Sequence, residues 1–488
     1  MKTSLPIQSF FGRDEHATYS DHKLPMYKDN PLIEALPPIF SAQDVMKKLS
    51  HFPKIDPAVR SLEPELRIHA ILDIEQFFQP LLRLYDLFTQ LSTMIYRGYC
   101  SRNPLALNFW SNLDQGIDDI KKNNQTIEYP RMRRSLLSSS LIGISGVGKT
   151  RSIEEILWLF PQVIHHREYQ GRAFTWTQLT WLKLECPHDG STRGLALQFL
   201  QVIDDRLGTN YIHMYTHRGR ASKDELLLAM ARVSALHSIG ILVIDEIQAL
   251  SQAKSGGAED MLNFFVQLVN LLNIPIVMVG TYKAEFLFSQ AFRQARRATG
   301  HGPIRWKPIQ RDEDWDLFLE ALWKYQYTST AVEFSNSFSD QLYAISQGIT
   351  DIAIKVFIVT QMQAIASREE KITKEGIAVA ADLALPLVRP FLDALRTNDL
   401  KRLSMMEDIE PLNIDSLVTS FLSTARQDED ISSYGKSKTS STTAENSDSD
   451  IHSSGLLSAL TDSVENDTVY DRLKDANYIG SVDDVVSE

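Results

Sequence analysis

Apolar positions divide the chain into a helical first part, a middle part of alternating strand-like and helix-like patterns, and a helical third part. Three mainly apolar runs in the middle part have the length of strands: residues 136–144, 239–244 and 274–280. Helical spacing lies between or after them, at residues 151–160, 192–207 and 223–238. Continuous apolar runs are typical of parallel strands covered on both faces. The pattern predicts an α/β fold with a mainly parallel sheet between two layers of helices.

Further elements are predicted around this core. Residues 162–170 and 174–185 predict a hairpin that turns at Gly171-Arg172 and whose second arm joins the central sheet, and residues 304–306 predict another strand. Residues 65–99 predict two helices that Pro80 divides or kinks, and residues 312–395 predict a lid-sized helical domain.

The first 60 residues predict an extended or partly ordered arm. Residues 97–104 predict a loop that carries Arg97 and Arg102. A solvated turn and a partner contact are equally open for this loop.

The first apolar run leads into Gly143-Ile-Ser-Gly-Val-Gly-Lys-Thr150, which fits the phosphate-binding loop G-x-x-x-x-G-K-[ST] at every fixed position. Glycines let backbone N–H groups approach phosphates, and the following helix N-terminus adds positive potential. Lys149 supplies a point charge. The pattern predicts an ATP site made by Gly143, Ser145, Gly146, Val147, Gly148, Lys149, Thr150 and Arg151.

The second apolar run ends in Asp245-Glu246, 95 residues after Thr150. A carboxylate pair that closes a buried strand is the Walker B arrangement. Asp245 and Thr150 are the predicted Mg²⁺ residues, Lys149 supports the phosphates, and Glu246 activates water. The third run ends at Thr281, which either lies beside the γ-phosphate or simply caps its strand.

Three arginines, Arg293, Arg296 and Arg297, follow at one helix end. One of them could stabilise transition-state charge at a neighbouring subunit's site. The alternative is a solvated basic face. Outside the Asp245–Glu246 pair we find no acidic triad of the kind that cuts DNA, so the predicted activity is ATP hydrolysis used as a switch.

Composition describes an ordinary globular protein, with 43% hydrophobic and 23% charged residues. Two cysteines, Cys100 and Cys186, far apart in sequence, suit a reducing cytoplasm, and we expect neither a signal peptide nor a membrane span. The net charge of −12 is uneven. Residues 425–488 hold fourteen acidic and five basic residues, a net −9, which leaves −3 for the rest. This balance neither supports nor excludes DNA binding.

Four regions are predicted: an N-terminal arm and helical extension for partner contact (1–125), a nucleotide-binding core (126–310), a helical lid (311–400) and an acidic, largely disordered tail (401–488). The tail carries short apolar islands, 455–460 and 482–486, of the type that folds on a partner.

Several strings along the chain resemble TnsC, the AAA+ ATP-dependent regulator of heteromeric cut-and-paste transposons, with TniB and MuB as more distant relatives. Besides the loop at 143–150, they are residues 97–104, 129–131, 178–184, 186–191, 207–211, 245–248, 279–281 and 315–326. The resemblance covers about residues 30–395. One departure is that no arginine lies near 348–351, where many AAA+ lids carry a sensor; Lys355 is the nearest basic residue.

The resemblance implies an AAA+ P-loop fold that uses ATP and Mg²⁺. It also implies a homo-oligomer, ring or helical filament, on double-stranded DNA. The implied protein partners are a target selector of the TnsD/TniQ type, sometimes with an RNA-guided complex, and a TnsB-type transposase, with a TnsA-type endonuclease where present. DNA contacts would be to phosphates, without sequence preference. The candidates are Arg167, Arg172, Lys183, Arg193, Arg218 and Arg220.

Two other functions stay open. A signalling or scaffold ATPase would use the same site as a switch without touching DNA. A replication-initiator-like ATPase would be expected to carry a helix-turn-helix module, and we find none after the lid.

Overall fold

The computed structural model describes residues 10–106, 138–216, 221–252, 264, 274–284, 304–397, 403 and 417–422. The chain splits into two compact units, Met1–Gln427 and Asp428–Glu488, and every described residue belongs to the first.

Among the described residues, five strands form the central sheet, and all are parallel, which agrees with the predicted mainly parallel sheet. Their order is β5 (Trp181–Glu185), β6 (Ile241–Asp245), β7 (Ile276–Gly280), β2 (Ser138–Ile142) and β8 (Ile304–Arg305). The strand that ends in Asp245 is therefore separated from the phosphate-loop strand by β7. Because parallel strands share one carboxyl edge, the ends of β2, β7 and β6 meet there.

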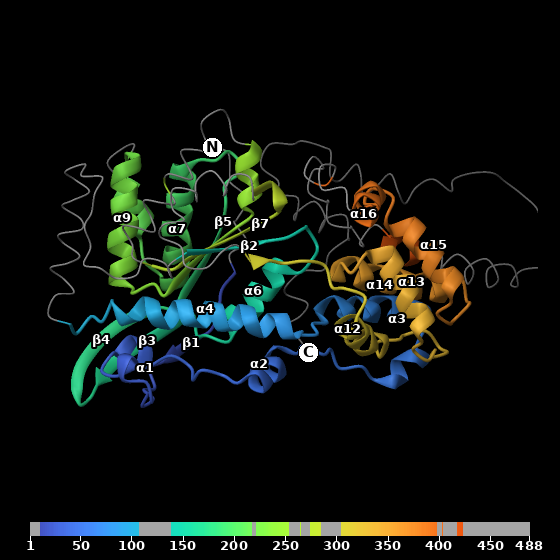
Figure 1. Cartoon of the computed structure of the whole chain (residues 1–488), viewed down its shortest axis with the longest axis horizontal. Coiled ribbons are helices and arrows are strands. Elements are labelled where there is room, and N and C mark those ends of the chain that lie inside the picture. Colours follow the sequence, from blue (N-terminus) through green and yellow to red (C-terminus); the bar gives the residue numbers. More distant parts are fainter. Residues whose placement is uncertain are drawn as a thin grey trace, which may run out of the picture. The chain divides into compact units, whose positions relative to one another are not determined.

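Helices cover both faces of this sheet (Figure 1). α4 (Leu82–Cys100) and α6 (Lys149–Trp158) pack on one face, and α7 (Thr192–Leu207) and α9 (Lys223–Leu236) on the other. Successive strand residues alternate between the two cores. Leu141, Val243 and Val279 face α4 and α6, whereas their neighbours Ile142, Ile244 and Met278 face α7 and α9. Double-sided burial is the reason that β6 and β7 are apolar at nearly every position.

The predicted hairpin is present as β3 (Val163–Tyr169) and β4 (Arg172–Leu179). Its second arm divides at Thr180, after which β5 enters the central sheet. The turn residues Gln170 and Gly171 both have positive φ. A short helix that the sequence analysis did not predict, α8 (Tyr211–Thr216), follows α7.

The segment predicted as a loose N-terminal arm is, over its described residues, packed on the core, which corrects that prediction. β1 (Asp14–His16) adds a parallel strand beside β3. The short helices η1 (Pro25–Tyr27), α1 (Pro31–Glu34) and α2 (Ala42–Leu49) follow, and Leu32 and Ile33 are fully buried. The sequence does not reveal this packing, because the segment has only short apolar stretches between polar residues. A segment that packs irregularly on another part of the protein has no regular hydrophobic period.

Two helical pieces follow with a break at Pro80, as predicted. α3 (Pro64–Ile71) lies between two 3₁₀ turns, η2 (Pro57–Ser61) and η3 (Leu72–Gln76), and α4 begins at Leu82. The predicted loop at 97–104 is wrong at its start, because α4 continues to Cys100. Arg102 is neither solvated nor exposed to a partner: it is buried and donates to the carbonyls of Gly98, Ile239 and Gly240.

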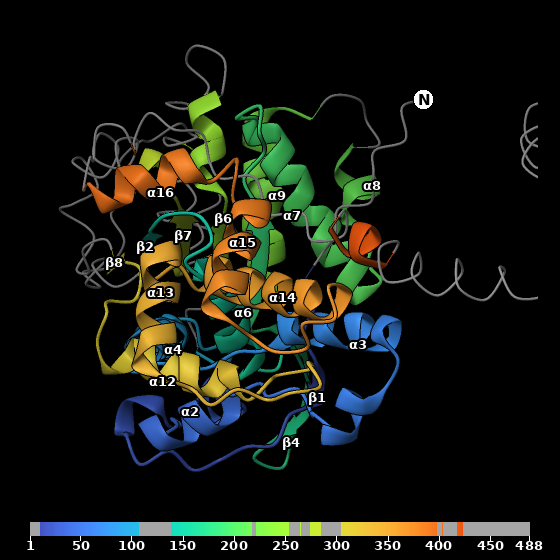
Figure 2. The same ribbon diagram turned by 90° about the vertical axis from the view of Figure 1, so that its right-hand side faces the viewer.

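Within the described residues, the segment predicted as a helical lid forms five helices (Figure 2). They are α12 (Glu313–Trp323), α13 (Asn336–Ser346), α14 (Thr350–Ala366), α15 (Lys374–Ala384) and α16 (Arg389–Arg396). α14 is apolar on nearly all sides and is the centre of the group. Among the described helices, no single one is long and apolar enough to span a membrane, and the one pair that passes together, α13 with α14, is bent by 118°.

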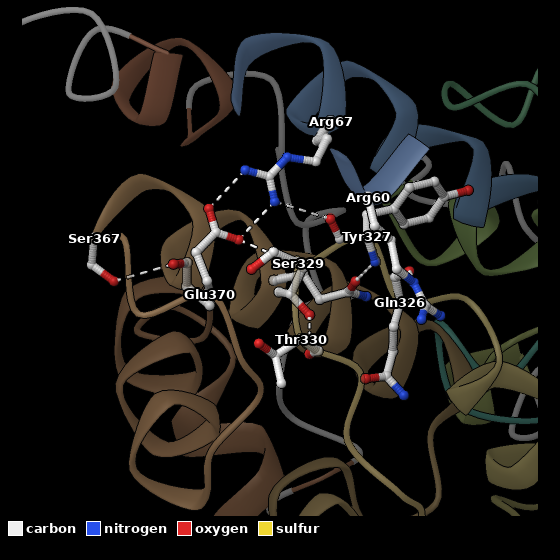
Figure 3. Close-up of polar contacts among 11 residues, drawn as sticks. Arg60, Arg67, Gln326, Tyr327, Ser329, Thr330, Ser367 and Glu370 are labelled. Carbon is white, nitrogen blue, oxygen red and sulfur yellow. Dashed lines mark hydrogen bonds and ion pairs between the residues drawn. The ribbon is translucent and has the colours of Figure 1, made fainter. Parts of the chain in front are cut away.

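The N-terminal helices contact the lid through an ion pair and hydrogen bonds (Figure 3). Arg67 of α3 is buried, and its guanidinium binds both oxygens of Glu370, at 2.6 and 2.7 Å. Arg60 and Arg67 also donate to the carbonyls of Gln326 and Tyr327. Because α4 of the same segment packs on the sheet, the N-terminal segment joins core and lid.

Candidate functional site

The phosphate loop lies between β2 and α6. Gly146 and Gly148 have φ of +74° and +89°, a region that side chains other than glycine rarely adopt. A Cβ on Gly143 would lie 2.2 Å from the carbonyl oxygen of Trp306, so this position also requires glycine. The Lys149 ammonium donates to the carbonyls of Gly143 and Ile144, at 2.9 and 2.7 Å. The loop thus holds its lysine folded inward, beside the place where the pattern predicts phosphates.

The predicted magnesium residues are in contact. The Thr150 hydroxyl donates to Asp245 Oδ2 at 2.8 Å, across the gap between α6 and the end of β6. The other carboxylate oxygen, Oδ1, accepts from the backbone N–H of Glu246 at 2.9 Å. Asp245 is only 3% exposed. These contacts fix the direction of its carboxylate.

Glu246 lies just beyond the strand, with backbone φ of +56°. This left-handed conformation is costly for a residue with a side chain. Gln248 links Glu246 to β7: its amide nitrogen donates to Glu246 Oε2, and its amide oxygen accepts from the N–H of Thr281 at 3.1 Å. The sequence analysis did not single out Gln248, since a glutamine two residues after a carboxylate pair has no distinct pattern.

Thr281 is buried at the end of β7, and its hydroxyl has no hydrogen-bond partner among the described residues. A buried hydroxyl without a partner costs about 1–3 kcal/mol. A bound oxygen-rich ligand would remove that cost.

A cavity of about 490 Å³ opens between the loop, the N-terminal segment and the lid. One wall is polar and is made by residues 145–152 and Glu246. An apolar part of the lining is made by Phe77, Phe78, Trp306, Phe318 and Ile354. Such a division suits a ligand with one highly charged end and one flat apolar end.

The N-terminal segment holds this cavity in shape. Arg151 of α6 donates to the carbonyls of Glu75 and Gln76, at 3.4 and 3.1 Å. The guanidinium of Arg83 lies over the Trp306 ring, 4.6 Å from its centre, and donates to the carbonyl of Lys307 at 2.6 Å. Burial lowers the pKa of Arg83 to about 10, so it stays charged at neutral pH.

The lid reaches the loop as well. Asp351 donates its N–H to the carbonyl of Gly146 at 3.4 Å, and Lys355 binds the Asp351 carboxylate at 2.9 Å. Both residues line the cavity. Lys355, the nearest basic residue to the missing lid arginine, therefore lies where it can respond to charge in the cavity.

The residues present fit a nucleotide with a divalent cation. A glycine cradle, a lysine, a hydroxyl–carboxylate pair and an unsatisfied buried hydroxyl meet at one sheet edge, and oxygen donors are what Mg²⁺ prefers.

The six predicted DNA contacts separate by environment. Arg167 and Arg172 are exposed on the β3–β4 hairpin. Arg193 is half-buried and donates to the carbonyl of Ala221. Lys183 is a correction: its side chain is 8% exposed and ion-paired to Glu154 and Asp245, so it is not available to a DNA phosphate. Burial lowers the pKa of Lys183, but the charges of Asp245 and Glu154 outweigh burial and hold it above the ordinary value.

The other predicted residues lie outside the described part of the chain. They are Arg218 and Arg220 of the DNA set, and Arg293, Arg296 and Arg297 of the trans-acting set. The apolar islands of the tail, residues 455–460 and 482–486, also lie outside the described part of the chain.

Comparison with known proteins adds a family match. Residues 133–288 match a family model described as an AAA domain. No curated protein compared with the chain matches it.

The solved structures that are similar to this chain include two ORC proteins and a Cdc6p. ORC1 of Aeropyrum pernix, in complex with DNA, is 18% identical, covers 66% of this chain and 84% of its own, and has a TM-score of 0.36. ORC2 of the same organism, in ADPNP–ADP complexes, is 12% identical, covers 66% of this chain and 86% of its own, and has a TM-score of 0.34. Cdc6p of Pyrobaculum aerophilum is 15% identical, covers 67% of this chain and 96% of its own, and has a TM-score of 0.33. Likenesses at this level carry no information on function.

The family match spans the loop lysine, the Asp245–Glu246 pair and Thr281, on strands whose order brings them to one edge. The chain therefore contains an AAA domain, the nucleotide-binding module of P-loop ATPases.

Proposed function

We propose that this protein is an ATP-dependent regulator of DNA transposition of the TnsC type. It binds ATP with Mg²⁺ and assembles as a ring or helical filament on double-stranded DNA. It links a target selector of the TnsD/TniQ type to a TnsB-type transposase, and to a TnsA-type endonuclease where one exists. The AAA domain supports the ATP-dependent part, and the strings that resemble TnsC support the transposition part.

The contact between Thr150 and Asp245 carries the ATP-dependent part. It brings a hydroxyl from the phosphate-loop helix to a carboxylate from another strand, 95 residues away, at 2.8 Å. Nucleotide-bound Mg²⁺ supplies charge neutralisation at the phosphates, and Thr150 and Asp245 are the residues that would hold it. Lys149, which now donates to loop carbonyls, exchanges these acceptors for phosphate oxygens.

Glu246 is the residue that orients and activates water for hydrolysis. It lines the cavity, and its backbone and side chain are both constrained, by the N–H bond to Asp245 and by Gln248. A general base gains rate from such fixed orientation. One of Arg293, Arg296 and Arg297 completes the site of a neighbouring subunit.

Each region has a role in this proposal. Residues 126–310 bind nucleotide and DNA, and residues 311–400 close over the nucleotide. Residues 1–125 contact the target selector, and residues 401–488 recruit the transposase. Arg167 and Arg172, exposed together on the hairpin, contact DNA phosphates.

Duplex binding with and without a non-hydrolysable ATP analogue tests the proposal. Fluorescence anisotropy on two unrelated sequences should show equal, analogue-dependent binding that weakens with salt, by about one unit of log–log slope for each phosphate contact. Electron microscopy of the same mixture should show rings or filaments.

The other candidate functions predict different results. A scaffold ATPase would bind the analogue but not DNA, and an initiator would prefer one sequence. Strong DNA binding that needs no analogue and shows no sequence preference would contradict all three.

A further inference from the structure

A buried lysine lies directly beneath the Asp245 carboxylate. Lys183 is in the middle of β5, and its side chain is 8% exposed. Its ammonium is 2.7 Å from Glu154 Oε1 and 3.6 Å from Asp245 Oδ2. The Asp245 oxygen that faces Lys183 is the one that accepts the Thr150 hydroxyl, at 2.8 Å.

Three elements that build the site converge on this ammonium. Lys183 comes from β5, Asp245 from the neighbouring strand β6, and Glu154 from the phosphate-loop helix α6. Glu154 is four residues after Thr150, so the two lie on the same face of that helix. The cluster holds two carboxylates and one ammonium, a net charge of −1.

The Lys183 ammonium has three donors and contacts two carboxylates unequally. Glu154 already supplies a close ion pair, at 2.7 Å. The second contact, with a carboxylate that a divalent cation is expected to use, sets two positive charges in competition for one oxygen. Inside a protein, charges this close are weakly screened.

We propose that Lys183 is a positioning residue that sets the concentration of Mg²⁺ required for nucleotide binding. Its ammonium holds the Asp245 carboxylate beside Thr150 and opposes a further cation on the same oxygen. Glu154 moderates this opposition by drawing part of the ammonium's charge away from Asp245. The inference rests on the proposed nucleotide function.

The two members of the ion pair should therefore act in opposite directions. Lys183→Met keeps the length of the side chain but removes the opposing charge, so nucleotide binding should need less Mg²⁺. The expected drop in the half-saturating Mg²⁺ concentration is on the order of tenfold, the usual size of outer-shell effects on metal affinity. Glu154→Gln leaves Lys183 to act on Asp245 alone, so the requirement should rise. A merely structural ion pair would shift both variants the same way, by loosening the site.

The experiment uses the full chain and a fluorescent, non-hydrolysable ATP analogue, titrated with MgCl₂. Lys47→Met, which removes an exposed lysine of α2, is the matched control and should leave the half-saturating Mg²⁺ concentration unchanged. If Lys183→Met does not fold, as judged by its thermal unfolding, Lys183→Met/Glu154→Gln is compared with Glu154→Gln. The double variant contains no unpaired Glu154 carboxylate, and it should need about tenfold less Mg²⁺ than the single variant.

Equal or higher Mg²⁺ requirements in the variants that lack Lys183 would overturn the inference while leaving nucleotide binding intact. If the wild-type protein binds no analogue at any Mg²⁺ concentration, the proposed function fails, and this inference with it.

Discussion

At the scale of single residues, the site depends on a few side chains that the backbone holds in costly positions. Glu246 is the clearest example, because its left-handed backbone and its bond to Gln248 leave its carboxylate little freedom. Such strain is tolerated where the surrounding contacts determine it.

Glu246→Gln should separate nucleotide binding from turnover. The amide keeps the shape of the side chain but cannot accept a proton, so ATP hydrolysis should fall by about 100-fold or more, while ATP still binds. Phosphate release and analogue binding measure the two effects. Glu320→Gln, which neutralises an exposed carboxylate on α12, is the control and should hydrolyse ATP at close to the wild-type rate. Wild-type turnover in Glu246→Gln would remove Glu246 from the mechanism.

Lys149→Ala should weaken ATP binding by about 3 kcal/mol, roughly 100-fold, because a charged donor to the phosphates is lost. Calorimetry with the ATP analogue measures this directly. DNA binding that depends on the analogue should disappear with it. Tight nucleotide binding by this variant would contradict the site assignment.

The sequence alone can single out these residues because their signals are local. Glycines, a lysine and a carboxylate pair keep fixed spacings whatever surrounds them. Lys183 and Arg102 were misassigned for the opposite reason: burial of a charge depends on strand pairing and helix packing far away in the chain. Arg102 is saturated by carbonyls of residues 98, 239 and 240, which no local pattern brings together.

At the scale of elements, the contact between α3 and the lid is the least expected from sequence. Helix periods reveal α3, α4 and the lid helices, but not which of them pack together. An arginine at residue 67 and a glutamate at residue 370 form a two-pronged ion pair, with Arg67 only 5% exposed in its side chain.

Arg67→Met should loosen the lid. Removing one member of a mostly buried pair leaves Glu370 with its bond from the Ser329 N–H, at a cost of about 2–4 kcal/mol. Amide hydrogen exchange in α14 and α15 should speed up accordingly. Arg60→Met, which loses a single bond to the Gln326 carbonyl, is the matched control and should cost about 1 kcal/mol. Equal amide exchange rates in α14 and α15 of both variants would show that the Arg67–Glu370 pair holds the lid no more strongly than the single Arg60 bond does.

A buried histidine of the β3–β4 hairpin predicts that the stability of the fold depends on pH. His166 is 2% exposed; its Nδ1 accepts from the Tyr19 hydroxyl, and its Nε2 donates to the Gln178 side-chain oxygen. Burial lowers the pKa of His166 to about 4. Below its ordinary pKa of about 6.5 the unfolded chain gains a proton that the folded chain does not, so stability is lost as pH falls from about 6.5 towards 4.

Between pH 7 and pH 5, this histidine alone should remove about 2 kcal/mol from the free energy of unfolding. Denaturant unfolding at the two pH values measures the loss. His166→Gln should show a smaller difference between them. If the variant and the wild type respond equally to pH, His166 is not the source.

At the scale of the whole molecule, the chain divides into a large unit and a C-terminal unit, Asp428–Glu488. The charge follows a similar division, with −9 in residues 425–488 and −3 in the rest. Composition alone predicts this uneven charge, because charge counts do not depend on structure.

Deleting residues 425–488 should leave ATP-dependent DNA binding intact, or slightly tighter at low salt, because negative charge that repels phosphates is removed. It should abolish transposition, since we propose that the tail recruits the transposase. Leu456→Ser/Leu457→Ser/Leu460→Ser, which keeps the charge, is the matched variant and should also lose transposition. Full transposition by the truncated protein would contradict the recruitment role.

The packing of α4 against the central sheet also has a consequence for synthesis. This helix leaves the ribosome early, yet the Tyr99 hydroxyl bonds the carbonyl of Ser238, 139 residues later. At 5–20 residues per second, roughly 7 to 28 s pass before that partner exists. Throughout this interval the sheet that covers the apolar stripe of α4 is incomplete, because β6 and β7 have not yet been made. We therefore expect a nascent chain of this protein to expose part of this stripe until β6 emerges.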